Sequence, residues 1–518
     1  MIQPRAMAVS LGLIRGTVAA CAILLAGCGG SSGPVTYTVR ASVSGLSGSG
    51  LILQLNAGND LAVTANGNST FATRLTSGMS YQVTVKTQPS SPQQVCTLGN
   101  ASGTVGTADV NDITVTCVTS IAILYSFTGG GGVTGSIDGA GPNGSLVQGG
   151  DGSLYGTTSS GGASILVCTS GCGTVFKITL SGHEMVLHSF GATAGDGIFP
   201  VVGLILGGDG NFYGPTPYRV GSISGSLYQI SAAGAESVIY PFPLVDGVDD
   251  FPMLSGVIQG SDGLLYGADY EFVVGSGYRY VIYGITTTGL RAFTADIGAD
   301  LSRQTHLVQT RDGSLYGTTN GGGAYGMGTV FKAKPDVGTI YSFGGISSDA
   351  LAPESPMIQG SDGNLYGTTP TGGRPSATCP QGCGTVFRVT PSGVETVLYS
   401  FGTSSADGQG PSGALVQASD GNFYGTTASG GSTASSGSAN SNCVSANVNS
   451  GYRGCGTIYK ITPTGIATVL YSFGSSPEDG TVPTGALLQA SDGNLYGTTT
   501  AGGAANEGKV FKLILGAN

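Results

Sequence analysis

Short runs of alternating apolar and polar residues, separated by turn residues, cover most of the chain after residue 35. Beyond residue 119, four such runs recur in a fixed order, and we call them segments A, B, C and D. One complete set is Gly413–Gln417, Asn422–Thr427, Gly456–Ile461 and Thr468–Phe473. Runs this short and rich in Val, Ile, Thr and Tyr predict β-strands. Asp-Gly between A and B, and Pro-Thr-Gly or Pro-Ser-Gly between C and D, suit tight hairpin turns.

The A–B turn and segment B together read Asp-Gly, two further residues and then Tyr-Gly, and this pattern occurs seven times at intervals of 50 to 72 residues. A fixed pattern at a loose period indicates a tandem array of one supersecondary unit. Four antiparallel strands per unit, repeated seven times, predict an all-β fold, a seven-bladed β-propeller of four-stranded blades. The tyrosines of segment B are Tyr155, Tyr213, Tyr266, Tyr316, Tyr366, Tyr424 and Tyr496.

The array does not begin with segment A and end with segment D. Its first segment, 121–127, is a D segment, and its last, 509–513, is a C segment. The last unit therefore lacks a fourth strand of its own. Because a ring of repeats otherwise touches only neighbours, we expect 121–127 to pair with 509–513 and to close the propeller, which we assign to residues 119–518.

The first 27 residues have the features of a signal peptide. Arg5 and Arg15 precede the apolar run Val18–Leu25, which is too short to span a membrane. The end of the run, Leu25-Ala26-Gly27-Cys28, resembles a bacterial lipobox. That resemblance implies cleavage before Cys28, lipidation of its thiol, and location at the outer membrane because Gly29 follows. The alternative is ordinary cleavage that leaves Cys28 free. Residues 28–34 would then form a tether.

Residues 35–118 predict a small β-sandwich of the Ig-like or transthyretin-like kind. Turn residues separate its expected strands, and Cys96 and Cys117 are its only cysteines. In an exported protein these two are expected to form a disulfide. We interpret the domain as a spacer between anchor and propeller. The expected strands are 36–43, 51–55, 61–64, 69–74, 80–85 and 113–117.

Composition narrows the classes of partner. Charged residues make up 9% of the chain, and the formal net charge is -10. Nucleic acids and anionic bilayers attract basic surfaces, so nucleic acid is not an expected partner. The 93 glycines, without a collagen period, indicate many tight turns.

The repeat resembles the GloVer tandem-repeat family, whose copies read much like LYSF…DG…LIQGSDGNLYGTT…GG…GTVFKITPSG. The likeness covers residues 121–515 and is weaker in the copies of Tyr213 and Tyr266, where Gly-Pro-Thr-Pro217 and Gly-Ala-Asp-Tyr270 replace Gly-Thr-Thr. The resemblance implies export and a propeller, and it implies no particular reaction.

Changes in length are concentrated between segments B and C, where the distance from the tyrosine to the aromatic residue of segment C ranges from 15 to 35. Variable loops on a rigid scaffold are where binding sites are expected. The B–C loops also contain six cysteines in a shared register, which predicts the disulfides Cys168–Cys172, Cys379–Cys383 and Cys443–Cys455.

Tyrosine and arginine in these loops are candidate ligand contacts, because both are common anchors of binding surfaces. The alternative is that the tyrosines cap the blade interiors and the arginines are simply exposed. The candidates are Tyr218, Arg219, Tyr270, Glu271, Tyr278, Arg279, Tyr325, Tyr452 and Arg453.

An aspartate lies 17 residues before most of the segment B tyrosines, in the D–A loops, and 16 before Tyr316. We favour turn chemistry, in which aspartate bonds its own backbone. The alternative is an acidic ring that holds Ca²⁺; no other cofactor is implied. These residues are Asp138, Asp196, Asp249, Asp300, Asp349, Asp407 and Asp479.

Three functions stay open at this point. The first is a non-catalytic binding module for an envelope protein or glycan, at the B–C face. The second is a polysaccharide lyase or hydrolase, and the third is a structural spacer. No catalytic residue is predicted, since His183, His188 and His306 stand at different positions of the repeat and assemble no triad or metal cluster in sequence. Acids near Asp249 and Glu271 leave paired carboxylates possible, but a glycosidase needs a set separation.

Overall fold

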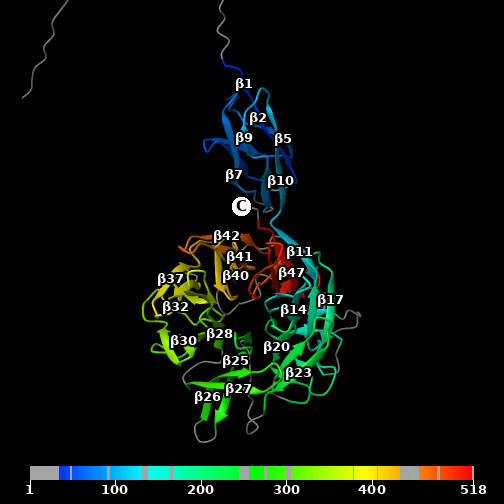
Figure 1. Cartoon of the computed structure of the whole chain (residues 1–518), viewed down its shortest axis with the longest axis vertical. Helices are drawn as coiled ribbons and strands as arrows, with labels where there is room; N and C mark the ends of the chain where they lie inside the picture. Colours follow the sequence, from blue (N-terminus) through cyan, green and yellow to red (C-terminus); the bar gives the residue numbers. More distant parts are fainter. Residues whose placement is uncertain are drawn as a thin grey trace, which may run out of the picture.

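The computed structural model describes most of the chain after residue 33 and consists there of strands and turns (Figure 1). The described residues are 34–46, 49–89, 94–129, 138–163, 167–222, 224–243, 256–273, 277–298, 305–376, 379–404, 407–431, 443, 454–474 and 479–515. The predicted signal peptide, Cys28 and tether lie before residue 34, outside this part. No helix in the described part is long and apolar enough to cross a membrane.

The N-terminal domain has two four-stranded sheets that share one apolar core. The sheet orders are β5-β2-β10-β8 and β4-β3-β7-β9, with β1 and β6 paired separately. β10 runs parallel to β2 and antiparallel to β8, and the Cys96–Cys117 disulfide joins directly opposed residues of β8 and β10. The strands are β1 (Thr36–Tyr37), β2 (Val39–Ser44), β3 (Leu51–Leu55), β4 (Asn59–Val63), β5 (Gly67–Thr70), β6 (Leu75–Thr76), β7 (Ser80–Thr87), β8 (Gln94–Gly99), β9 (Ser102–Thr104) and β10 (Val110–Thr119).

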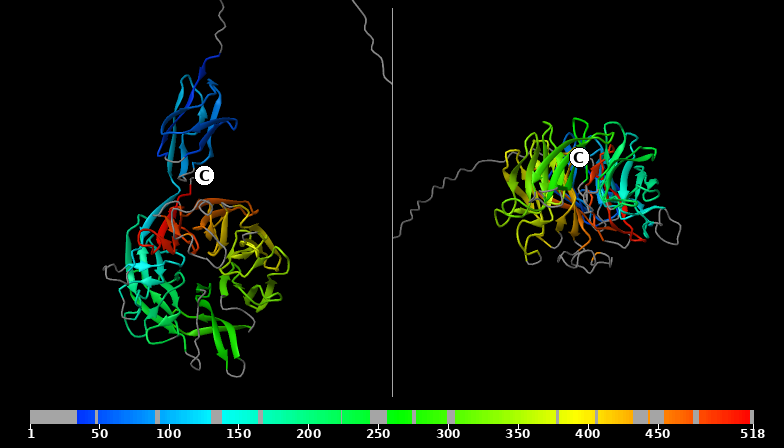
Figure 2. Two further views of the ribbon diagram at one scale, coloured as in Figure 1. Left: turned by 180° about the vertical axis from the view of Figure 1, so that it is seen from behind. Right: turned by 90° about the horizontal axis from the view of Figure 1, so that it is seen from below.

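Seven sheets with the strand order A-B-C-D follow in the described chain, and they lie around a ring beside the N-terminal domain (Figures 1 and 2). We number them blades 1 to 7 in the order of the segment B tyrosines. Blade 1 is β13 (Val147–Gln148), β14 (Leu154–Thr158), β16 (Thr174–Ile178) and β17 (Glu184–Ser189); blade 2 is β19 (Ile205–Leu206), β20 (Phe212–Thr216), β22 (Ser226–Ile230) and β23 (Glu236–Pro241); blade 3 is β24 (Ile258–Gln259), β25 (Leu265–Val273), β26 (Gly277–Ile285) and β27 (Arg291–Gly298); blade 4 is β28 (Thr305–Gln309), β29 (Leu315–Thr319), β30 (Thr329–Lys334) and β31 (Gly338–Ser342).

The last three blades complete the ring. Blade 5 is β33 (Ile358–Gln359), β34 (Leu365–Thr369), β36 (Thr385–Val389) and β37 (Glu395–Ser400); blade 6 is β39 (Val416–Gln417), β40 (Phe423–Gly430), β41 (Thr457–Ile461) and β42 (Ala467–Ser472), with β38 (Gly408–Pro411) also on β40; blade 7 is β44 (Leu488–Gln489), β45 (Leu495–Thr499), β47 (Lys509–Leu513) and β11 (Ile121–Ser126). The fourth strand of blade 7 therefore comes from the start of the array, with Ile121 opposite Leu513 and Ser126 opposite Lys509.

Short ladders tie the D–A loops to the starts of the B–C loops, so these two sets of loops emerge together. The ladders are β12 (Gly139–Ala140) with β15 (Ser160–Gly161), β18 (Gly197–Ile198) with β21 (Tyr218–Arg219), β32 (Ala350–Leu351) with β35 (Thr371–Gly372), and β43 (Gly480–Thr481) with β46 (Ala501–Gly502).

The glutamine at the end of segment A joins neighbouring blades. Its side-chain oxygen accepts a backbone N–H from the A–B turn of the preceding blade, and its amide donates to a glycine carbonyl in its own turn. Six blade junctions have this contact, at 2.7–2.9 Å, including the one between blades 7 and 1, where Ser491 N–H donates to Gln148. The contact explains why this glutamine stands at a constant seven residues before the tyrosine.

The two threonines of Gly-Thr-Thr have different partners. The first donates across the junction to a carbonyl before the A strand of the next blade, as Thr368 does to Gly413 and Thr498 to Gly144. The second is buried against a threonine of segment C in its own blade, as in Thr369 with Thr385 at 2.7 Å. One motif thus stabilises both a blade and its contact with the next.

The glycine after the tyrosine leaves room for the aromatic residue of segment C. At Gly367 a Cβ would lie 2.5 Å from Cζ of Phe387, which is fully buried. We expect Gly367→Ala to cost about 1–3 kcal/mol, because the core must shift to relieve the overlap. Chemical denaturation measures the cost, and Gly338→Ala, whose Cβ would meet nothing within 4 Å, is the control. Equal stability of the two variants would contradict this packing.

Candidate functional site

The A–B turns present a repeated polar cluster. The tyrosine hydroxyl of segment B donates to the turn aspartate at 2.6–3.0 Å in six blades. In blades 1 and 7 a lysine of segment C adds an ion pair, as in Lys512 with Asp492 at 2.7 Å. These lysines also lie over the tyrosine rings, so they belong to the cluster.

These contacts keep the turn carboxylates ionised. Burial opposes ionisation of Asp151, but hydrogen bonds from Lys177, the Ser153 N–H and Tyr155 outweigh it and lower the pKa to about 2. Burial likewise opposes ionisation of Asp420, whose pKa is lowered by hydrogen bonds from Asn422 and Tyr424. The A–B face is therefore lined by hydrogen-bond acceptors at neutral pH.

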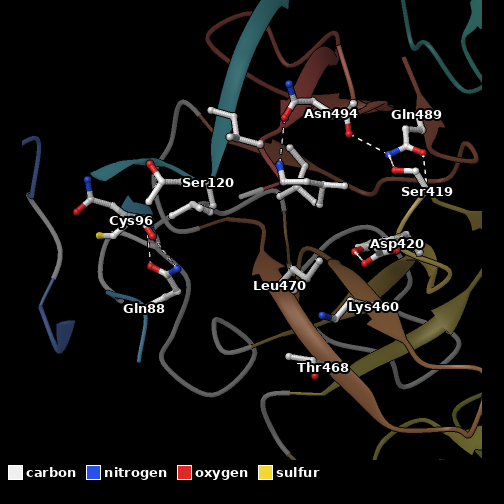
Figure 3. Close-up of a pocket in the computed structure, with 18 of the residues that line it drawn as sticks. Gln88, Cys96, Ser120, Ser419, Asp420, Lys460, Thr468, Leu470, Gln489 and Asn494 are labelled. Atoms are coloured by element: carbon white, nitrogen blue, oxygen red, sulfur yellow. Dashed lines mark hydrogen bonds between the residues drawn. The ribbon is translucent and has the colours of Figure 1, made fainter. Parts of the chain in front are cut away.

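A pocket of about 1010 Å³ lies between the N-terminal domain and the A–B turns of blades 6 and 7 (Figure 3). Val95 and Cys96 of β8 line one side, and Lys460, Asp420 and Asn494 line the other. Its polar groups are held in place, since Asn494 accepts the Leu515 N–H and Gln88 exchanges two hydrogen bonds with the Cys96 backbone. The pocket offers fixed polar groups on both domains, an arrangement suited to binding a polar ligand.

The candidate residues of the B–C loops are not brought together as one cluster among the described residues. Arg219 is half-buried and donates to the Ser224 hydroxyl and to the Phe242 carbonyl. Arg279 pairs with Asp296 at 2.6 Å on the neighbouring strand. Tyr218 lies in β21, and Tyr325 is 57% exposed. Arg219 is thus a structural contact, whereas Tyr325 is largely exposed.

For the other candidate residues of the B–C loops, the structure describes either the backbone alone or nothing. Tyr270, Glu271 and Tyr278 belong to the long hairpin β25–β26, where Glu271 stands opposite Arg279 in the backbone register, and their side chains are not described. Tyr452 and Arg453 lie outside the described residues. All three predicted B–C disulfides are present, so the four disulfides indicate an oxidising compartment and hence export.

The D–A loop aspartates are buried and hydrogen-bonded within their own loops. Asp349 accepts from the Tyr341 hydroxyl at 3.0 Å and from the Gly344 and Gly345 N–H groups, and Asp407 and Asp479 have matching partners. Asp138 accepts from Tyr125 and from the backbone and hydroxyl of Thr128. Asp249 and Asp300 lie outside the described residues. These contacts are the turn chemistry expected for such residues.

Glutamates at the start of three D strands complete a second repeated cluster. Burial and the nearby charge of Asp349 raise the pKa of Glu395 to about 7, and burial and Asp138 do the same for Glu184. One carboxylate oxygen of each is buried without a hydrogen-bond partner. In blade 6 Ala467 takes the glutamate position, and a cavity of about 160 Å³ opens there beside Asp407. The recurrence of glutamate at this position was visible in the sequence, but its partners on the previous blade were not.

The sheet order and the ring of blades define a β-propeller protein. The model of the Gloeobacter/Verrucomicrobia repeat family matches residues 49–277 and 255–441, and the chain belongs to this family. None of the curated proteins compared with the chain matches it.

Three solved structures are similar to this chain at low identity. An extracellular domain from B. thetaiotaomicron, described as part of a hybrid two-component system, has a TM-score of 0.43 at 12% identity, over 89% of this chain and 50% of that one. The periplasmic gluconolactonase of Pseudomonas aeruginosa has a TM-score of 0.39 at 14% identity, over 67% and 93%. The β-propeller domain of the Trilobed protease of Pyrococcus furiosus has a TM-score of 0.38 at 9% identity, over 71% and 95%. The chain spans half the length of the first.

Proposed function

We propose that the chain is an outer-membrane lipoprotein, anchored through Cys28, whose closed seven-bladed propeller binds an envelope protein or glycan without converting it. The N-terminal domain, an Ig-like sandwich in this proposal, holds the propeller away from the membrane. The lipobox-like sequence supports the anchor, and the disulfides support export.

One observation carries the binding role. Three B–C loops, two of equal length and one longer, are each tied by a disulfide just before strand C, in a ring whose A–B turns are uniform. A tied loop loses less conformational entropy when a ligand binds. The B–C face is therefore the proposed binding face. Among the candidate tyrosines whose side chains the structure describes, Tyr325 is the exposed one.

The pocket between the domains is the second candidate site. It has a volume in the range of ligand pockets, and two domains line it. The pocket lies at the A–B turns, whereas the first candidate site is formed by the B–C loops. Mutations can therefore test the two candidate sites separately.

A binding screen with the full chain against envelope proteins and glycans tests the proposal. In one variant, residues 428–456 are replaced by the shorter 500–508 of blade 7, which removes Cys443 and Cys455 together. In the other, Val95→Arg fills the pocket from the N-terminal domain. Loss of binding in the loop variant alone places the site on the B–C face, and loss in Val95→Arg alone places it in the pocket. Turnover of any polysaccharide in the panel would replace the binding role with the enzymatic one.

A further inference from the structure

A three-residue cluster recurs where the outer D strands of neighbouring blades meet, and we call it the rim triad. It joins a D-strand residue, the aspartate of the following D–A loop and the glutamate that begins the next D strand. Two triads have tyrosine first: Tyr125–Asp138–Glu184 and Tyr341–Asp349–Glu395. The third is His188–Asp196–Glu236, in which histidine takes the tyrosine position. A nitrogen donor thus replaces a hydroxyl at one copy of an otherwise repeated site.

The three donors of the histidine triad lie close together. The ring nitrogen of His188 and carboxylate oxygens of Asp196 and Glu236 are all within 4.8 Å of one another. One oxygen of Glu236 is buried and has no hydrogen-bond partner. The Asp196 side chain is 4% exposed, and that of His188 is 20% exposed, which leaves a path from solvent. The donors are therefore largely removed from water but can be reached by an ion.

The distance between His188 and Asp196 suits shared ligation better than a hydrogen bond. Nε2 of His188 is 3.4 Å from Oδ1 of Asp196, which is long for a hydrogen bond. Two ligands of a tetrahedral ion, each about 2.1 Å from the metal, stand about 3.4 Å apart. In the tyrosine triads the equivalent contacts are hydrogen bonds of 2.8 and 3.0 Å.

We propose that His188, Asp196 and Glu236 bind one divalent transition-metal ion of the zinc class between blades 1 and 2. An imidazole with two carboxylates favours Zn²⁺ over Ca²⁺ and Mg²⁺, which take oxygen ligands alone. Three protein ligands leave a fourth position for water or for a group of a bound partner. The proposal shares Asp196 with the calcium-ring hypothesis but differs from it, since it uses one blade junction and a nitrogen ligand.

The other triads provide matched variants. His188→Tyr installs the residue that Tyr125 and Tyr341 already provide at this position, so the fold should be kept while the nitrogen donor is lost. Tyr341→His makes the reverse change in the triad of Asp349 and Glu395. Melting curves of both variants in metal-free buffer should match the wild type, which checks that each still folds.

The test is zinc stoichiometry of the purified full chain, stripped with EDTA and then equilibrated with micromolar Zn²⁺. We expect one Zn²⁺ per wild-type chain, none in His188→Tyr and two in Tyr341→His, by elemental analysis after gel filtration. Co²⁺ should give visible d–d absorption in the wild type that His188→Tyr abolishes. Zinc retained in His188→Tyr, no zinc in the wild type, no gain in Tyr341→His, or Ca²⁺ bound as tightly as Zn²⁺ would each overturn the assignment.

Discussion

Replacing residues 121–127 with a Gly-Ser linker of equal length should lower the free energy of unfolding by about 5 kcal/mol or more. The replacement leaves β47 without its outer neighbour and removes Phe127, which is 1% exposed and packs edge-on against Phe176. Loss of a buried phenylalanine side chain alone costs about 3–5 kcal/mol. The replacement also removes the hydrogen bond that the Tyr125 hydroxyl donates to Asp138, so this buried carboxylate loses one of its hydrogen-bond donors.

Thermal and chemical unfolding of the full chain measure this effect. Ile123→Ser is the matched control, because Ile123 lies in the same strand but is 37% exposed; we expect a change within about 0.5 kcal/mol. A linker variant that unfolds at the wild-type midpoint would show that β11 does not stabilise blade 7.

The double variant Glu184→Gln, Glu395→Gln should be more stable than the wild type at pH 8, by about 3 kcal/mol, and similar to it at pH 5. Both glutamates have folded-state pKa values of about 7, raised from 4.5 by burial and by a neighbouring aspartate. Such a shift is worth at most about 3.4 kcal/mol per group. We take about half of that, because both groups are partly solvated.

The sign follows from proton linkage. The folded chain binds these protons more tightly than the unfolded chain, so the stabilising effect is complete below about pH 4.5 and is lost as the pH rises through 7. Glutamine keeps the shape and stays neutral, so the variant should lose less stability over this range. Denaturation midpoints at pH 5 and pH 8 measure the difference. If the denaturation midpoint of the variant falls as much between pH 5 and pH 8 as that of the wild type, the raised pKa values of Glu184 and Glu395 would be contradicted.

The repeat itself could be predicted in detail, because its offsets reflect local geometry. The strand segments, the out-of-phase ends and the four cysteine pairs all follow from positions such as Cys379 and Cys383, which are four residues apart. Glycines mark the tight turns, and the tyrosine keeps a fixed distance from its turn aspartate, since both belong to one hairpin.

Contacts between units could not be predicted in this way. The glutamine contact, the rim triads and the Lys–Asp–Tyr cluster each depend on how strands or blades are placed beside one another. In the N-terminal domain, the strand β8 around Cys96 was not predicted, and the strand expected at 69–74 begins at Gly67 and ends at Thr70, because the bend at Asn66 leads directly into β5. The pocket depends on the placement of two domains, for which the sequence holds no periodic signal.

The central claim is that the two ends of the array are joined in one blade. Oxidation of the full chain with Ala122→Cys and Lys512→Cys tests it directly, because these positions are paired across β11 and β47, and opposed antiparallel residues are at disulfide distance. The control is Ala122→Cys with Lys460→Cys, the equivalent lysine of blade 6, which stands opposite Thr468. We predict that mass spectrometry finds the 122–512 cross-link in most chains and no 122–460 cross-link. Absence of the first, or equal yield of the two, would contradict the closed ring.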